Sequence, residues 1–239
     1  MYNKESKPKK FRNFYGRLKG KGLRALQQKL LNDQLEKLSI PAVKYEINPD
    51  RKLIELSDLF KNVTSFSLEI GFGGGEHLVY QAERNPNIGF IGCEPYINGV
   101  AMLAGKLSKL ELTNVRIHPG DVRDLFDVLP DDSIDSVFLL YPDPWPKKRH
   151  HRRRFVTSEY LIDLQRVMKT GALLRLATDI PDYVRQSLQE VCKHHFSWTA
   201  TDAQDWRECW SDWMPTRYER KALREGRRPY YLTFEKRES

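Results

Sequence analysis

The stretch SFSLEIGFGGGEHL, residues 65–78, joins a short apolar run to a glycine-rich turn and the start of a helical pattern. Such a unit is typical of proteins in which strands alternate with helices. Further apolar runs of strand length, with helical patterns between or beside them, follow at 88–94, 114–121, 135–142 and 172–179. The pattern predicts an α/β fold with a doubly wound, mostly parallel sheet. The tail YYLTFEK (230–236) alternates and predicts an edge or antiparallel strand.

Upstream of this unit the composition changes. Residues 1–22 are rich in lysine, arginine and glycine, which is typical of a segment that is disordered in the free protein. Leucines at 23, 26, 30, 31, 35 and 38 then recur at helical spacing, and the helix is expected to stop near Pro41. We therefore expect a basic arm and helix over 1–58 and the strand-and-helix domain over 59–239.

The bulk composition excludes several classes of protein. The 239 residues are 40% hydrophobic, which fits one folded domain with an extension. No apolar run approaches the ~20 residues that span a bilayer, and no secretory signal is visible. Cys93, Cys192 and Cys209 are scattered without metal-ligand spacing. We expect reduced thiols, no bound metal and a cytoplasmic protein.

The formal net charge of +8 is unevenly placed. Basic residues cluster at 4–29, where Glu5 is the single acid, at 147–154 and at 217–228. Three separated clusters favour an extended polyanion as partner, because neutralising phosphates releases counterions. A generically basic, solvated surface is the alternative.

Acidic side chains stand at or near the end of each expected parallel strand. They are Glu69, Glu94, Asp121, Asp143 and Asp179. Ligands of doubly wound sheets bind at the carboxyl ends of the strands, so these acids are candidate ligand-binding groups.

The glycine turn after the first strand discriminates between cofactors. Its glycines follow the spacing G-x-G-x-G from Gly71, and Glu76 occupies the position where a dinucleotide fingerprint has its last glycine. An acid followed by this spacing resembles class I S-adenosylmethionine-dependent methyltransferases. We expect the cofactor at the turn formed by Gly71 and Gly73. A nicotinamide site or a purely structural turn is the alternative.

Each acid has an expected role toward that cofactor. Glu69 is expected to hold its ammonium group, directly or through water. Glu94 is expected to accept from both ribose hydroxyls, and Asp121 from the adenine amino group. For Asp121 a helix-capping role competes with this reading. Asp143 is expected to reach both the cofactor and the substrate.

Several motifs resemble one family over nearly the whole chain and in that family's order. They are FYGRLKG (14–20), EIGFGGGEHL (69–78), PDPWPKKRH (142–150), ATDIPDY (177–183) and PTRYERKA (215–222). The sequence resembles the bacterial tRNA (guanine-N7)-methyltransferases. The resemblance implies methyl transfer from S-adenosylmethionine, which leaves S-adenosylhomocysteine, to guanosine 46 in the variable loop of tRNA. Tyr218 departs slightly from the family, where Phe is common.

The resemblance and the chemistry agree on Asp143. Guanine N7 carries a lone pair and no proton, so methylation there requires no general base. A carboxylate beside the ring stabilises the developing positive charge and can accept from its N1–H and exocyclic amine. Pro142 and Pro144 limit the backbone freedom of Asp143, which is therefore the expected catalytic residue. A turn-capping acid is the alternative.

The resemblance also implies residues that meet the RNA. The expected substrate-binding residues are Lys147, Asp179, Thr216, Arg217, Tyr218 and Glu219. The expected RNA-contacting residues are Arg149, His150, His151, Arg152, Arg153 and Arg154. Surface ion pairing is the alternative for Arg217 with Glu219 or Arg220, worth about 0–1 kcal/mol.

Some questions stay open at the level of sequence. Trp206, Trp210 and Trp213 have helical spacing, and we expect packing more than base stacking. A tRNA partner is expected with no obligatory protein partner, as a monomer or homodimer. Two rival functions are methylation at another RNA position or of DNA, and RNA binding without catalysis.

Overall fold

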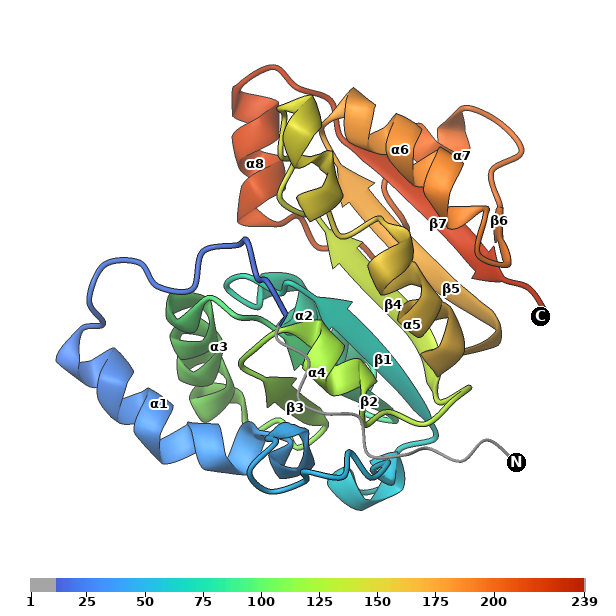
Figure 1. Cartoon of the computed structure of the whole chain (residues 1–239). Helices are drawn as coiled ribbons and strands as arrows, with labels where there is room; N and C mark the ends of the chain where they lie inside the picture. Colours follow the sequence, from blue (N-terminus) through green and yellow to red (C-terminus); the bar gives the residue numbers. More distant parts are fainter. Residues whose placement is uncertain (1–11, 239) are drawn as a thin grey trace.

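The computed structural model describes residues 12–238 and contains one seven-stranded sheet in the order β3-β2-β1-β4-β5-β7-β6 (Figure 1). The strands are β1 (Ser65–Ile70), β2 (Ile88–Cys93), β3 (Val115–His118), β4 (Ile134–Leu140), β5 (Met168–Thr178), β6 (Phe196–Trp198) and β7 (Tyr230–Lys236). The pairs among β1 to β5 are parallel, whereas β7 pairs antiparallel with both β5 and β6. The chain order reverses between β1 and β4, where doubly wound sheets bind their ligands.

Helices connect the strands and cover the sheet. They are α1 (Ala25–Leu38), α2 (Glu76–Arg84), α3 (Ile97–Leu110), α4 (Val122–Phe126), α5 (Ser158–Val167), α6 (Pro181–Val191), α7 (Gln204–Arg207) and α8 (Arg217–Arg224). Three short 3₁₀ helices complete the elements: η1 (Pro41–Val43), η2 (Leu56–Leu59) and η3 (Lys148–Arg153).

Alternation along the strands divides the core between the two faces of the sheet. In β1, Leu68 and Ile70 pack with buried residues of α4, α5 and α6 such as Phe126 and Leu161. Residues of α2 and α3 such as Leu78 form a second cluster, which α1 joins. Period-two alternation thus buries both faces, as the near-continuous apolar runs predict.

The structure confirms the predicted fold class, including the antiparallel strand β7. Two details differ. The sheet ends at β6, a strand of three residues that the sequence analysis missed, so β7 lies inside the sheet. Of the three tryptophans with helical spacing, only Trp206 lies in a helix, because α7 ends at Arg207.

The expected basic extension is only partly described. Its residues 1–11 lie outside the described part of the chain. Residues 12–22 contact the domain, although the composition predicts disorder for this segment. Arg12 donates to Asp124 (3.0 Å) and Asp127 (2.8 Å) near α4, and Leu18 O accepts from Ile97 N at 3.0 Å. Specific partners more than 75 residues away along the chain thus hold this segment against the domain, although its composition is typical of disorder. The domain boundary at residues 58/59 stays a prediction.

Helix α1 packs against the domain and does not stand apart from it. Its buried Leu31 and Leu38 share a core cluster with Leu103 of α3. Within residues 12–238, none of the helices has the length and apolar character needed to cross a membrane.

Candidate active site

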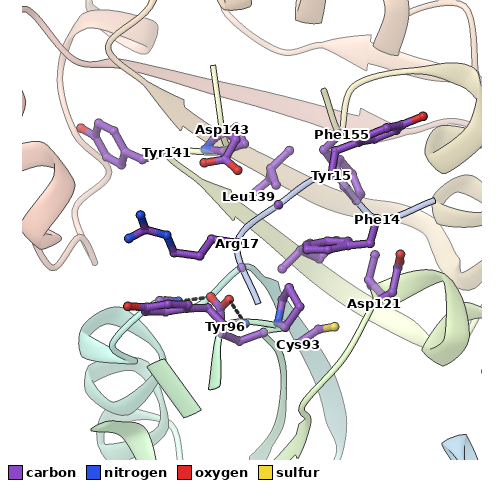
Figure 2. A pocket seen from close by; sticks show the side chains of 18 of the residues that line it. Phe14, Tyr15, Arg17, Cys93, Tyr96, Asp121, Leu139, Tyr141, Asp143 and Phe155 are labelled. Carbon is purple, nitrogen blue, oxygen red and sulfur yellow. Dashed lines mark hydrogen bonds between the residues drawn. The ribbon is translucent and has the colours of Figure 1, made fainter. Parts of the chain in front are cut away.

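A cavity of about 580 Å³ opens at the carboxyl ends of β1, β2 and β4 (Figure 2). Ligand sites are expected at this edge, and the volume lies within the range of about 300–1,000 Å³ for small-molecule pockets. Of the predicted site residues, the lining includes Gly71, Gly73, Glu94, Asp121, Asp143, Arg153, Arg217 and Tyr218. The fold therefore brings much of the predicted cofactor site to one cavity.

The glycine turn and Glu94 form one hydrogen-bonded unit. Gly73 N donates to Glu94 Oε2 at 2.7 Å, and Tyr96 N donates to Oε1 at 2.8 Å. Gly73 has a φ of 56°, in the left-handed region that favours glycine. A Cβ at Gly99 would lie 2.2 Å from Gly73 O, so only glycine lets α3 approach the turn so closely. The two backbone N–H donors thus fix the Glu94 carboxylate in the cavity lining, beside the glycine turn.

Glu94 is poorly solvated. Its residue is only 7% exposed, and burial raises the pKa of its carboxyl to about 7 despite the two backbone N–H donors. The nearby acids Asp143 and Glu69 raise it further. A ligand that donates hydrogen bonds to this carboxylate, as ribose hydroxyls do, would offset part of the free energy that burying its charge costs.

Asp121 has the helix-capping role that the sequence left open, and it also stands at the cavity. It caps α4 by accepting from Arg123 N at 2.9 Å, and it also accepts from the Arg123 guanidinium. It lines the cavity as well. The capping role is therefore real, and a ligand role for Asp121 would share its carboxylate with Arg123.

Glu69 does not line the cavity. Its side chain is buried, with a 2.7 Å hydrogen bond between Glu69 Oε2 and His77 Nδ1 of α2. Strand alternation explains this placement, since Glu69 points to the face opposite Leu68 and Ile70. Direct contact with the ammonium group of a cofactor is therefore not built into this arrangement.

Asp143 lies on the opposite side of the cavity from Tyr96 and Cys93 (Figure 2). It follows β4 in a loop where Tyr141 and Trp145 both have positive φ, 50° and 40°. Desolvation by the cavity walls raises the pKa of its carboxyl, although the side chain faces open space. Such a partly desolvated carboxylate is stabilised electrostatically when positive charge develops beside it.

The predicted substrate-binding residues divide into two groups. Arg217 and Tyr218, at the start of α8, line the cavity, and Arg217 is paired with Glu76 of α2. Lys147 is exposed. The cavity lining does not include Lys147, Asp179, Thr216 or Glu219.

Thr216 and Glu219 instead hold α8 in place. Thr216 Oγ1 caps α8 by accepting from Glu219 N at 3.2 Å. Glu219 is buried, and its carboxylate accepts from Trp213 Nε1 (2.7 Å) and Tyr231 OH (2.8 Å). Asp179 is paired with Arg227. Thr216 and Glu219 thus stabilise α8, which carries the cavity-lining residues Arg217 and Tyr218.

The predicted RNA-contacting stretch also divides. Arg149 and Arg152 are exposed on η3, and His150 and His151 are half-buried. Arg153 stacks over the rings of Tyr15 and Trp145 at the cavity rim. Arg154 is only 1% exposed and bonds within the protein, so its predicted contact with RNA does not fit the structure.

The sequence analysis missed one part of the cavity wall. Phe14, Tyr15, Gly16 and Arg17 of the N-terminal segment line it, and the segment crosses the cavity between Asp143 and Cys93 (Figure 2). The motif FYGRLKG was the available signal, but the basic composition around it pointed to disorder.

The three tryptophans pack within the protein, as expected. Trp213 is 8% exposed and Trp210 contacts it edge-on, while Trp206 stacks on Tyr230. Within residues 12–238, no group of three or more His, Cys, Asp or Glu side chains gathers as metal ligands would.

The chain matches a family model described as a putative methyltransferase over residues 64–232. It is also 61% identical to the tRNA (guanine-N(7)-)-methyltransferase of Roseobacter denitrificans, over 97% of this chain and 98% of that protein. The chain belongs to the tRNA (guanine-N(7)-)-methyltransferase family. The tRNA (guanine-N(7)-)-methyltransferase of Agrobacterium fabrum is 47% identical, over 94% of this chain and 95% of that one.

Membership of the tRNA (guanine-N(7)-)-methyltransferase family confirms the resemblance carried by the motifs from FYGRLKG to PTRYERKA. Solved structures support the fold. A structure titled as the 16S rRNA methyltransferase KamB covers 77% of this chain and 93% of its own, at 16% identity and a TM-score of 0.58. An antibiotic-related methyltransferase covers 79% and 98%, at 18% identity and a TM-score of 0.56. These two structures therefore share the fold of this chain.

Proposed function

We propose that the protein transfers a methyl group from S-adenosylmethionine to N7 of a guanine in tRNA and releases S-adenosylhomocysteine. The family supports the reaction, since its members are tRNA (guanine-N(7)-)-methyltransferases. The observation that carries the proposal is that two carboxylates, Glu94 and Asp143, line one cavity, with Asp143 on the opposite side from Tyr96, whose backbone N–H donates to Glu94 (Figure 2).

The residues present fit such a cofactor. The buried Glu94 carboxylate can accept hydrogen bonds from ribose hydroxyls, and Asp121 stands at the next strand end. Because Gly71 and Gly73 have no side chains, the turn leaves space for the cofactor beside the backbone. When bound, the cofactor supplies an electrophilic methyl group on a sulfonium. Glu69 acts at most through an intermediary, because it is buried against His77 outside the lining.

Asp143 acts on the base. N7 attacks with its own lone pair, so no residue has to remove a proton first. The carboxylate stabilises the positive charge that spreads over the ring and accepts from the base edge. Holding N7 in line with the methyl group supplies the rest of the rate enhancement.

The exposed cations of η3 and α8 suit the RNA backbone. Arg149 and Arg152 of η3 are exposed, as are Arg220, Lys221 and Arg224 of α8. Both elements adjoin the cavity rim through Arg153 and Tyr218. Phosphates bound there would bring one base of the RNA to Asp143. The target, guanosine 46 of the variable loop, rests on the resemblance alone.

Other features of the proposal await their own tests. We propose tRNA as the macromolecular partner, no obligatory protein partner, and a monomeric or homodimeric protein. The cytoplasmic location also stays a prediction.

The proposal is tested with S-adenosylmethionine that carries a labelled methyl group and two tRNA transcripts. One transcript contains guanosine and the other contains 7-deazaguanosine, which lacks the N7 lone pair. We expect label in the first transcript alone, with both transcripts binding equally. Label in the 7-deaza transcript would place the methyl group elsewhere, and binding without label in either would favour an RNA-binding module.

A further inference from the structure

One cation of the basic stretch is turned into the protein. The residue Arg154, directly after η3, is 1% exposed, whereas Arg152 two residues earlier is exposed. Its guanidinium donates to Pro144 O through Nε (2.8 Å), to Gln186 Oε1 through Nη1 (2.7 Å) and to Asp182 Oδ2 through Nη2 (2.8 Å). It also lies over the ring of Tyr183, 5.2 Å from the centroid.

These contacts join the two ends of a loop to one helix. Pro144 directly follows Asp143, and Arg154 closes the loop ten residues later. Asp182, Tyr183 and Gln186 all belong to α6, which is anchored by the buried residues Tyr183, Ser187 and Val191. Gln186 Nε2 also donates to Val156 O at 2.7 Å, which ties the chain just beyond the loop to the same helix.

We infer that Arg154 is a positioning residue that holds the carboxylate of Asp143 in place through the carbonyl of Pro144. The inference rests on the proposed function, in which Asp143 meets the base. The planar guanidinium reaches three acceptors in fixed directions, which a lysine cannot do. The same closure leaves Lys147 to Arg153 as the outer part of the loop, where RNA can meet them.

The closest alternative for Arg154 is a phosphate contact like that proposed for Arg152. The two roles predict different kinetics. A phosphate contact contributes to tRNA affinity and to its salt dependence. A positioning contact contributes to turnover, since a misplacement of about 1 Å can cost roughly 100-fold in rate.

The test compares Arg154→Gln with Arg152→Gln under single-turnover conditions with labelled S-adenosylmethionine and saturating tRNA. Circular dichroism first establishes that each variant is folded at the assay temperature. For Arg154→Gln we expect a methyl-transfer rate lower by on the order of 100-fold, with tRNA affinity and its salt slope unchanged. Arg154→Lys should stay impaired. Arg152→Gln should weaken tRNA binding and lower the salt slope by about one.

A normal transfer rate in folded Arg154→Gln would overturn the inference. If the salt slope of that variant were also reduced, Arg154 would instead belong to the RNA interface. A wild-type protein that methylates no tRNA would instead refute the proposed function, so the two failures are distinguishable.

A second variant covers the case in which Arg154→Gln does not fold. Gln186→Met removes the acceptor of Nη1 and the donor to Val156 O but leaves the buried charge paired with Asp182. We expect a slower transfer at unchanged tRNA affinity. An unchanged rate in folded Gln186→Met would count against positioning through this contact set.

Discussion

Asp143 differs from the other four strand-end acids because it is exposed, and it lines the cavity from a loop position between two prolines. We predict that Asp143→Asn keeps the affinity for cofactor and tRNA within a few-fold but lowers turnover by about 10²–10³, since one electrostatic stabiliser is typically worth that much. Quenched-flow methyl transfer with saturating tRNA measures the rate. Turnover near the wild-type level would remove Asp143 from the chemistry.

We predict that Glu94 makes the affinity for the cofactor depend on pH. Burial raises the pKa of its carboxyl to about 7, so below that pH the empty site is mostly protonated and must release a proton to accept two ribose hydroxyls. Affinity for S-adenosylmethionine should therefore rise as the pH increases toward about 7, by at most about tenfold per pH unit, and level off above it.

Calorimetry in buffers of different ionisation enthalpy would detect the released proton. Glu94→Gln is the control, because it shares any titration of the cofactor itself. We expect weaker binding and less proton release in this variant than in the wild type over the same range. Equal proton release in wild type and variant would assign the titration to another group.

Some residues of the candidate site could be predicted from local sequence patterns, and others could not. The acids at strand ends were predictable, because parallel strands end at one edge. Strand alternation places the Glu69 side chain on the face of the sheet where it meets His77 of α2, outside the cavity lining. For Arg154 no local pattern helps, since its acceptor on Gln186 lies 32 residues away and a charge run does not reveal which guanidinium turns inward.

At the scale of elements, η3 carries the exposed cations of the basic loop. We predict that the double variant Arg149→Gln with Arg152→Gln lowers the slope of log affinity against log salt concentration by about two, because each phosphate contact contributes roughly one. Filter binding to tRNA at several salt concentrations measures the slope. An unchanged slope would exclude η3 from the RNA interface.

The sequence predicted the elements whose pattern is long and periodic, such as β1, α2 and β2. Short elements escaped for a physical reason. Strand β6 has three residues, too few for alternation to show, and its position depends on pairing with β7. Helix α8 begins at Arg217, after its N-cap Thr216. The capping bond comes from Glu219 N, and the Glu219 side chain is held by Trp213 and Tyr231.

At the scale of the whole molecule, the N-terminal segment closes over the cavity. Composition predicted disorder, yet Arg12 binds Asp124 and Asp127 more than 100 residues along the chain. We predict that Arg12→Ala loosens the segment, so trypsin cuts faster after the exposed Arg17 and Lys19 while the domain stays intact. Mass spectrometry of timed digests identifies the cuts.

Lys29→Ala is the matched control, since Lys29 is an exposed basic residue on α1, whereas Arg12 is bound to Asp124 and Asp127. Its cleavage rate at Arg17 should equal that of the wild type. Equal rates in Arg12→Ala and wild type would show that the Arg12 contacts do not hold the segment.

The central claim is that this cavity directs a methyl group to N7 of one guanine in tRNA. The most direct measurement treats an unmodified tRNA transcript with the protein and S-adenosylmethionine, reduces it with borohydride and cleaves it with aniline at 7-methylguanosine. We predict one cut, at the variable-loop guanosine, and no detectable cut with Asp143→Asn in the same reaction time. Methylated tRNA that aniline does not cut would contradict it.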